Sequence, residues 1–142
     1  MPENILLIDD EKDFLDVMTE RMEARGFEVS TSMSAKEALG MIKKGAYDAI
    51  ILDLQMPGMD GIEALKAIKD IQPEAQIILL TGHATVEKGV EAIKLGATDF
   101  IEKPADLETL SRKIKNAHAE KIMIVEKKEK EAVIDALKRF GM

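Results

Sequence analysis

Short apolar runs alternate with amphipathic stretches five times within the first 119 residues, and this alternation is the strongest constraint on the fold. The apolar runs, such as residues 49–52 and 76–80, are rich in β-formers, which is typical of strands buried on both faces. The stretches between them place apolar residues at helical spacing, as in residues 12–25. Repeated strand–helix units with short links predict a doubly wound α/β fold, in which helices cover both faces of a parallel sheet.

The expected elements follow from this pattern. The five expected strands are residues 5–8, 27–32, 49–52, 76–80 and 99–102. The expected helices are residues 12–25, a helix from Ser34 to about residue 44, residues 61–70, residues 85–95 and a last helix from about Asp106. Ser34, with Glu37 three residues later, has the pattern of a helix capping box. Gly26 and Gly96 are expected to end the helices that precede them.

The pattern changes after Ala119. An apolar group at residues 122–125 precedes a run of mixed charges at residues 126–131, and further apolar residues follow at helical spacing. Because no glycine or proline lies between Ala105 and Phe140, the sequence allows one long helix or two abutting helices. We expect a domain at residues 1–119 and a C-terminal helical extension at residues 120–142. The extension either lengthens the last helix into a dimer contact or folds back on the domain.

Composition narrows the classes of function. The net charge of −7 makes direct binding to nucleic acid or to an anionic membrane unfavourable. The absence of cysteine excludes disulfides, thiolate metal sites and a cysteine nucleophile. The polar N-terminus does not resemble a signal peptide, and no apolar run reaches membrane-spanning length. We therefore expect a cytoplasmic protein.

Polar residues stand where the expected strands end. Asp9 and Asp10 follow the first strand, Asp53 the third, Thr81 the fourth and Lys103 the fifth. Parallel strands end at one edge of their sheet, which we call the carboxyl edge, and open α/β sheets bind ligands there. The sequence therefore predicts that these side chains lie close together.

The residue types at this edge indicate phosphoryl transfer. Clustered carboxylates repel each other unless a cation neutralises them. Oxygen ligands without histidine or cysteine suit Mg²⁺, which also retains waters for a phosphate. Lys103 would supply a positive charge and Thr81 a hydroxyl donor, with Asp53 as the nucleophile.

Four segments carry a resemblance to a known family. They are residues 8–11 (IDDE), 52–61 (LDLQMPGMDG), 80–82 (LTG) and 96–104 (GATDFIEKP). In this order and spacing, the chain resembles the CheY-like receiver domain of two-component response regulators over about residues 4–119. The resemblance implies a flavodoxin-like, five-stranded sheet in the order 2-1-3-4-5.

The resemblance also assigns roles in phosphorylation. It implies that Asp53 accepts a phosphoryl group from a sensor histidine kinase or a phosphotransfer protein. It implies that Asp10, Asp53 and the backbone carbonyl of Gln55 bind Mg²⁺. Asp9 would act mainly through water. The chain would then be a switch rather than an enzyme, although it would promote its own phosphorylation and dephosphorylation.

The same resemblance describes how the switch works. Thr81 and Lys103 would hold the phosphoryl oxygens, and Pro104 matches a proline that follows a cis peptide bond. Phe100 matches the family's switch aromatic, which turns inward when the Thr81 hydroxyl moves toward the phosphoryl group. This motion would reshape the face of the fourth helix, fifth strand and fifth helix for an unidentified downstream protein or a second copy of the chain. His83 and Gln55 stand where the family tunes phosphoryl lifetime, although we expect His83 to be an exposed loop residue rather than a catalytic base.

Three other functions fit the sequence less well. A haloacid dehalogenase-type hydrolase needs a second acid where Gln55 stands, and it gives Asp9 and Asp10 no role. A flavodoxin-like flavin binder needs a phosphate-binding loop where Asp9, Asp10 and Glu11 would repel phosphate. A module that is never phosphorylated leaves the complete acceptor set without a purpose. Of two receiver arrangements, we prefer a stand-alone regulator over the N-terminal part of a longer transcriptional regulator.

Overall fold

A computed structural model describes residues 2–56, 59–82, 86–104 and 106–141, and within these ranges five parallel strands form one sheet. The strand order is β2-β1-β3-β6-β7, which is 2-1-3-4-5 when the sheet strands are counted along the chain. The predicted strand order is therefore confirmed. The strands are β1 (Asn4–Ile8), β2 (Glu28–Ser32), β3 (Ala49–Asp53), β6 (Ile77–Thr81) and β7 (Asp99–Glu102).

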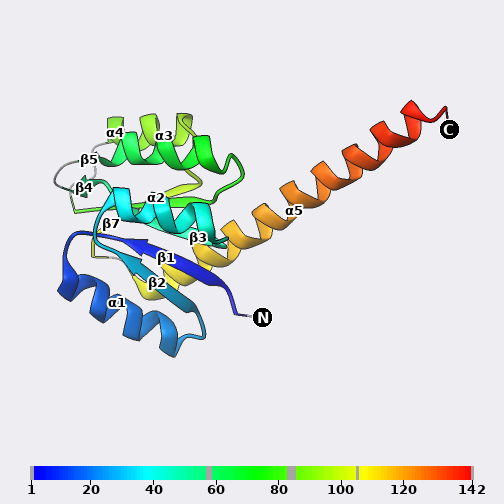
Figure 1. The fold of residues 1–142 in the computed structure, drawn as a ribbon. Helices are drawn as coiled ribbons and strands as arrows, with labels where there is room; N and C mark the ends of the chain where they lie inside the picture. Colours follow the sequence, from blue (N-terminus) through cyan, green and yellow to red (C-terminus); the bar gives the residue numbers. More distant parts are fainter. Residues whose placement is uncertain (1, 57–58, 83–85, 105, 142) are drawn as a thin grey trace.

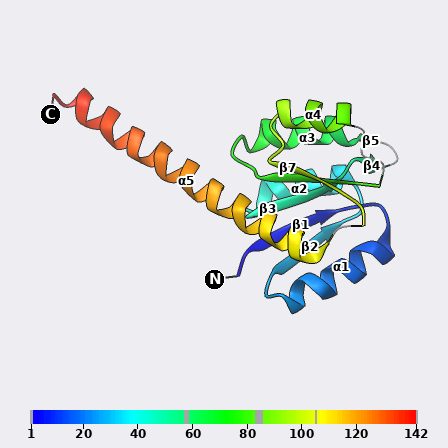
Figure 2. The same cartoon turned by 180° about the vertical axis from the view of Figure 1, so that it is seen from behind.

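The helices form two layers around this sheet (Figures 1 and 2). α1 (Lys12–Ala24) and α5 (Leu107–Arg139) pack on one face of the sheet. α2 (Ala35–Lys44), α3 (Gly61–Ile71) and α4 (Val86–Lys94) pack on the other face. The predicted doubly wound architecture is therefore confirmed.

Alternation along the strands divides the core into two clusters, because successive side chains point to opposite faces. The α2–α3–α4 side receives one set of strand residues, which includes Leu6, Ile50, Leu52 and Ile77. The α1–α5 side receives the intervening set, which includes Ile5, Ile51, Ile78 and Leu80. Every residue of β3 and β6 is buried, so these central strands are apolar nearly throughout.

The ends of several helices follow from local sequence. The Ser34 hydroxyl accepts a hydrogen bond from the backbone N–H of Glu37 at 3.2 Å, which confirms the predicted cap of α2. Gly26 and Gly96 follow α1 and α4 with φ angles of 93° and 106°, a backbone conformation that favours glycine. At the start of α5, hydrogen bonds from the hydroxyl and backbone of Thr109 hold the pKa of Asp106 below its usual value.

A short antiparallel pair was not predicted. β4 (Gln55–Met56) and β5 (Met59–Asp60) pair beside the carboxyl end of β3. Each strand has two residues, which is too short for a detectable alternation of apolar and polar residues. Residues 57–58, which separate these two strands in the sequence, lie outside the described residues.

α5 is one continuous helix, so the alternative of two abutting helices is wrong. Its last half projects away from the domain and does not fold back on it (Figures 1 and 2). The helix crosses Ala119 without interruption, and the domain boundary there stays a prediction. None of the helices in the described ranges combines the length and the apolar character that a membrane span requires.

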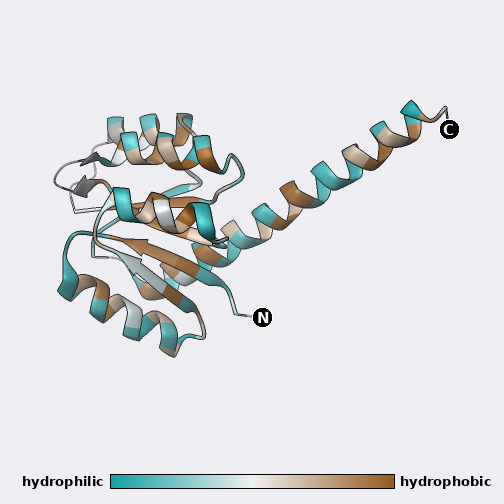
Figure 3. Cartoon of the chain, viewed as in Figure 1, coloured by the Kyte–Doolittle hydropathy of each residue, from teal (hydrophilic) through white to brown (hydrophobic). Residues whose placement is uncertain are grey.

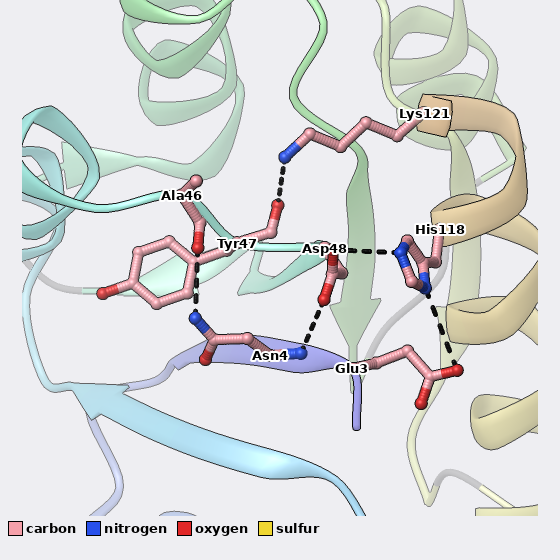
Figure 4. A network of polar contacts seen from close by, with 7 residues as sticks. All are labelled: Glu3, Asn4, Ala46, Tyr47, Asp48, His118 and Lys121. Carbon is pink, nitrogen blue, oxygen red and sulfur yellow. Dashed lines mark hydrogen bonds and ion pairs between the residues drawn. The ribbon is translucent and has the colours of Figure 1, made fainter. Parts of the chain in front are cut away.

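A polar network fixes α5 to the edge of the sheet opposite the carboxyl edge (Figure 4). Asp48, just before β3, accepts a hydrogen bond from the backbone N–H of Asn4 at 2.7 Å and lies 3.2 Å from His118 of α5. One turn further, Lys121 donates to the backbone carbonyl of Tyr47 at 2.8 Å. We call this the base network; its residues are Glu3, Asn4, Ala46, Tyr47, Asp48, His118 and Lys121.

Gly61 is required by a close approach at the start of α3. A Cβ at this position would lie 2.6 Å from Cα and 2.9 Å from the carbonyl oxygen of Leu54, and backbone atoms cannot move aside easily. We therefore expect Gly61→Ala to lower the free energy of unfolding by about 1–3 kcal/mol. The measurement is urea unfolding followed by circular dichroism.

Gly40→Ala in α2 is the matched control. Among the described residues, no atom outside Gly40, its chain neighbours and the adjacent backbone of α2 lies within 4 Å of its added Cβ. This substitution should raise the free energy of unfolding by about 0.5–1 kcal/mol, since alanine loses less entropy in a helix than glycine does. Equal stability of the two variants would contradict the steric explanation for Gly61.

Candidate functional site

The carboxyl edge brings together the side chains that the sequence placed at strand ends. Asp9 follows β1, Asp53 ends β3 and Lys103 follows β7. The Lys103 ammonium lies 2.8 Å from Oδ2 of Asp9 and 3.8 Å from Oδ2 of Asp53. Thr81 ends β6, and its backbone carbonyl accepts a hydrogen bond from the N–H of Lys103 at 2.7 Å. Residues separated by up to 94 positions in sequence thus share one site.

Three carboxylates form an acidic cluster at this edge. Asp9, Asp10 and Asp53 each offer an oxygen, and these oxygens lie within 4.8 Å of one another. Asp9 and Asp53 are only 2% and 5% exposed, so water screens their repulsion poorly. A hard divalent cation satisfies this all-oxygen donor set, so the residues present fit the Mg²⁺ that the family resemblance implies.

Asp9 has a partner for each carboxylate oxygen. Oδ1 accepts a hydrogen bond from the backbone N–H of Glu11 at 2.9 Å, and Oδ2 accepts one from Lys103 at 2.8 Å. These two contacts fix the carboxylate in place. Asp10, which is half-buried, extends the cluster toward solvent.

Lys103 is held as a cation among the acids. Burial alone would lower the pKa of Lys103, but the hydrogen bond and charge of Asp9, together with the charges of Asp53 and Glu11, raise it above its usual value. The ammonium also lies 4.3 Å from the centroid of the Phe14 ring, a favourable cation–π distance. The Lys103–Pro104 peptide bond is cis, the geometry that the family resemblance implies for it. Lys103 thus offers a permanent positive charge to an anion at this edge.

Phe14 has a place at the site that the sequence did not reveal. It belongs to the apolar stripe of α1 and packs partly against the core beneath that helix. An aromatic residue at a helical core position carries no signal that separates a cation partner from an ordinary core residue. Its role becomes visible only when β7 and α1 are placed together.

Three of the remaining predicted residues lie within the described ranges. The Thr81 side chain is 1% exposed at the end of β6, and Gln55 begins β4 two residues after Asp53. Phe100 is half-buried in β7, and a Cβ added to Gly89 of α4 would lie 3.5 Å from its ring. α4 therefore packs closely on this aromatic ring. His83 lies outside the described residues.

Comparison with known proteins gives a family match. The model of the response regulator receiver domain matches residues 5–115. The C4-dicarboxylate transport transcriptional regulatory protein DctD of Rhizobium meliloti (strain 1021) is 36% identical over 123 residues, which cover 87% of this chain. The aligned region spans only 27% of the length of DctD.

Solved structures support the same relationship. A response regulator receiver domain protein from Clostridium thermocellum is 35% identical with a TM-score of 0.82, and the match covers 86% of this chain and 98% of that one. A Burkholderia pseudomallei response regulator with a phosphorylated aspartic acid, a calcium ion and citrate is 27% identical, with a TM-score of 0.75 and coverage of 98% and 86%. The beryllofluoride-activated NtrC4 receiver domain dimer is 35% identical, with a TM-score of 0.78 and coverage of 83% and 98%.

The acidic cluster predicts that Mg²⁺ stabilises the folded chain. At about ten times its dissociation constant, the ion should raise the free energy of unfolding by about 1.4 kcal/mol, because the unfolded chain does not hold the acids together. Asp10→Asn should remove most of this increase, since it removes one charged ligand. Urea unfolding in chelator and in Mg²⁺ measures both effects.

Asp16→Asn is the control for this experiment. Asp16 lies on the exposed face of α1, where it pairs with Lys12 at 3.8 Å, and it should leave the Mg²⁺ effect unchanged. If Mg²⁺ stabilises the Asp10→Asn and Asp16→Asn variants equally, the ion does not bind at the cluster.

Proposed function

The chain belongs to the response regulator receiver domain family, whose members are signalling switches of two-component systems, and we propose that Asp53 is its phosphorylated residue. One observation carries the proposal: Asp53 lies at the carboxyl end of a central strand, 3.8 Å from a lysine ammonium and beside two further carboxylates. A nucleophilic carboxylate with a cation beside it is the arrangement that phosphoryl transfer to aspartate requires.

The proposed donor is the phosphohistidine of a sensor histidine kinase or of a phosphotransfer protein. A carboxylate oxygen of Asp53 attacks the phosphorus atom, and the bond from phosphorus to the imidazole nitrogen breaks. The electron pair of that bond stays with the imidazole, and an acyl phosphate forms on Asp53. Lys103 and the Thr81 hydroxyl then stabilise the oxygens of the transferred group.

In this proposal Asp10, Asp53 and the backbone carbonyl of Gln55 hold Mg²⁺, and Asp9 acts through water. The ion supplies positive charge to the phosphoryl oxygens when it is bound. The contacts of Asp9 support its indirect role, because Lys103 and the N–H of Glu11 already engage its two oxygens. Asp9 therefore positions Lys103.

Similarity to known proteins supports the proposed phosphorylation chemistry, but it does not assign the activity of the longer relatives to this chain. The Burkholderia pseudomallei neighbour is itself described with a phosphorylated aspartic acid and a calcium ion. DctD is much longer than the aligned region, so its transcriptional activity is not assigned to this chain. We propose that the output passes through protein contacts on α4, β7 and α5.

Phosphorylation is proposed to change this face through Phe100. The acyl phosphate carries roughly two negative charges where the Asp53 carboxylate carried one, and the Thr81 hydroxyl moves toward them. Phe100 packs against α4 next to Gly89, so an inward turn of its ring removes a contact that now supports α4. The result is a shift between two populations of the α4–β7–α5 face.

Intact mass after incubation with acetyl phosphate tests the phosphorylation site. With Mg²⁺ the chain should gain one phosphoryl group, which hydroxylamine removes because an acyl phosphate is labile to this nucleophile. Asp53→Asn should gain none, whereas the surface control Asp16→Asn should behave as the unchanged chain. A phosphoryl group on Asp53→Asn would place the acceptor elsewhere, and no gain in any variant would favour a module that is never phosphorylated.

Amide hydrogen exchange with and without the phosphodonor tests the role of Phe100. In the unchanged chain, phosphorylation should alter exchange in α4 and β7. Phe100→Ala should keep Asp53 phosphorylation and confine the change to the neighbourhood of Asp53, since the aromatic link to α4 is lost. Met33→Ala, an exposed position between β2 and α2, is the control. An unaltered exchange pattern in Phe100→Ala would show that the ring does not transmit the change.

A further inference from the structure

The projecting half of α5 exposes large apolar side chains. Met123, Val133, Leu137 and Phe140 are 70%, 59%, 44% and 81% exposed. Figure 3 shows hydrophobic bands alternating with hydrophilic ones along this part of the helix. A helix of this length without packing is marginally stable in water, and a long apolar stripe on a surface marks a contact with another molecule.

Four of the exposed large apolar residues, Met123, Val133, Leu137 and Phe140, follow a heptad repeat, and the exposed Ile122 and Ile134 flank it. Seven exposed positions are spaced alternately by four and by three residues along the helix. They are 119, 123, 126, 130, 133, 137 and 140. We call this stripe the seam. Spacing of this kind places residues on one face of a helix and is the pattern by which two helices pack in a coiled coil.

The seam lies away from the domain to which α5 is attached. His118, Lys121 and Lys128 form the contacts of this helix with Asp48, Tyr47 and Glu74. These positions lie between about 90° and 170° around the helix from the centre of the seam, at 3.6 residues per turn. A second helix can therefore lie along the seam without displacing the contacts that hold α5.

Two charged residues at the centre of the seam discriminate between a parallel and an antiparallel pair of helices. Glu126 and Lys130 occupy adjacent seam positions, with Met123 before them and Val133 after them. In a parallel pair of identical helices, each of these charged residues meets its own copy, so both central layers repel. In an antiparallel pair, Glu126 meets the partner's Lys130, and both central layers attract.

The apolar layers match in the same antiparallel register. When Glu126 faces the partner's Lys130, Met123 faces the partner's Val133 and Ala119 faces the partner's Leu137. The twofold axis then passes between the two helices at the level of residue 128, and the contact is the same on both helices, as a closed dimer requires. Lys127 and Glu129 flank the seam, and in this register each lies near its own copy; because both are exposed to water, this repulsion is weaker than the attraction in the two seam layers.

We propose that two copies of this chain form an antiparallel helical pair through residues 119–140 of α5. The two receiver domains then lie at opposite ends of the pair, and neither α4 nor β7 takes part in the contact. The pairing therefore does not require phosphorylation of Asp53, and it can hold whether or not the proposed phosphorylation occurs.

Engineered cysteines test the orientation, since the chain contains no native cysteine. Met123→Cys and Val133→Cys should each give little cross-linked dimer alone under mild oxidation. An equimolar mixture of these two proteins, and the double variant, should cross-link efficiently because position 123 faces the partner's position 133. Both positions are exposed on a helix outside the core, so neither substitution should affect folding. Efficient cross-linking of each single variant with itself would show a parallel pair and overturn the proposal.

Sedimentation equilibrium of the full chain tests the charged layers. Lys130→Glu places Glu126 opposite another glutamate and should raise the dimer dissociation constant by about tenfold or more. The double variant Glu126→Lys with Lys130→Glu restores opposite charges in both layers and should recover the original dissociation constant. Lys127→Glu, beside the seam, is the control with the same change in net charge.

Three results of the sedimentation experiments would also overturn the inference. The first is a monomer at every concentration up to about 1 mM, which would leave the stripe to another molecule. The second is an equal effect of Lys130→Glu and Lys127→Glu, which would indicate a general effect of charge. The third is a failure of the double variant to recover dimerisation.

Discussion

Burial of the central strands on both faces is the constraint on which the rest of this structure depends. β3 and β6 bury every residue, so helices must cover the sheet above and below. A chain that alternates strand and helix meets this demand with parallel strands, whose carboxyl ends meet at one edge. Asp9, Asp53, Thr81 and Lys103 share a site for that reason, although no local interaction links them in sequence.

The site combines repulsion and attraction in a small, poorly solvated space. The oxygens of three carboxylates lie within 4.8 Å of one another, a placement that opposes folding unless positive charge is near. Lys103 supplies one such charge, and its bond to Asp9 fixes where it lies. A cluster of this kind offers carboxylate ligands to a cation and an ammonium group to an anion beside it. The proposed phosphorylation of Asp53 would use both the carboxylates and the ammonium group of this cluster.

α5 connects the domain to its surroundings. Its first half contributes Leu110, Ile114 and Ala117 to the core, and its second half leaves the domain with a stripe of exposed apolar residues. His118 and Lys121 mark the transition, because their contacts with Asp48 and Tyr47 hold the helix at the base of the sheet. The projecting half therefore has a defined direction relative to the domain, which is a condition for a specific pairing of two helices.

The sequence by itself determined the elements of the fold and the residues at the strand ends. Apolar runs located the sheet strands to within a residue or two, Ser34 marked the start of α2, and the motifs around Asp53 and Lys103 indicated strand order through family resemblance. These features depend on short-range periodicity and on local hydrogen bonds, which the order of residues records directly.

Only the tertiary structure decided the remaining features. It showed that α5 is one helix, that β4 pairs with β5, that Lys103 lies between Asp9 and the Phe14 ring, and that His118 reaches Asp48. The long-range contacts among these join segments up to 94 residues apart, and nothing in either segment alone specifies the other. Such pairings depend on how the sheet and its helices pack, because packing alone brings distant side chains within a few ångströms.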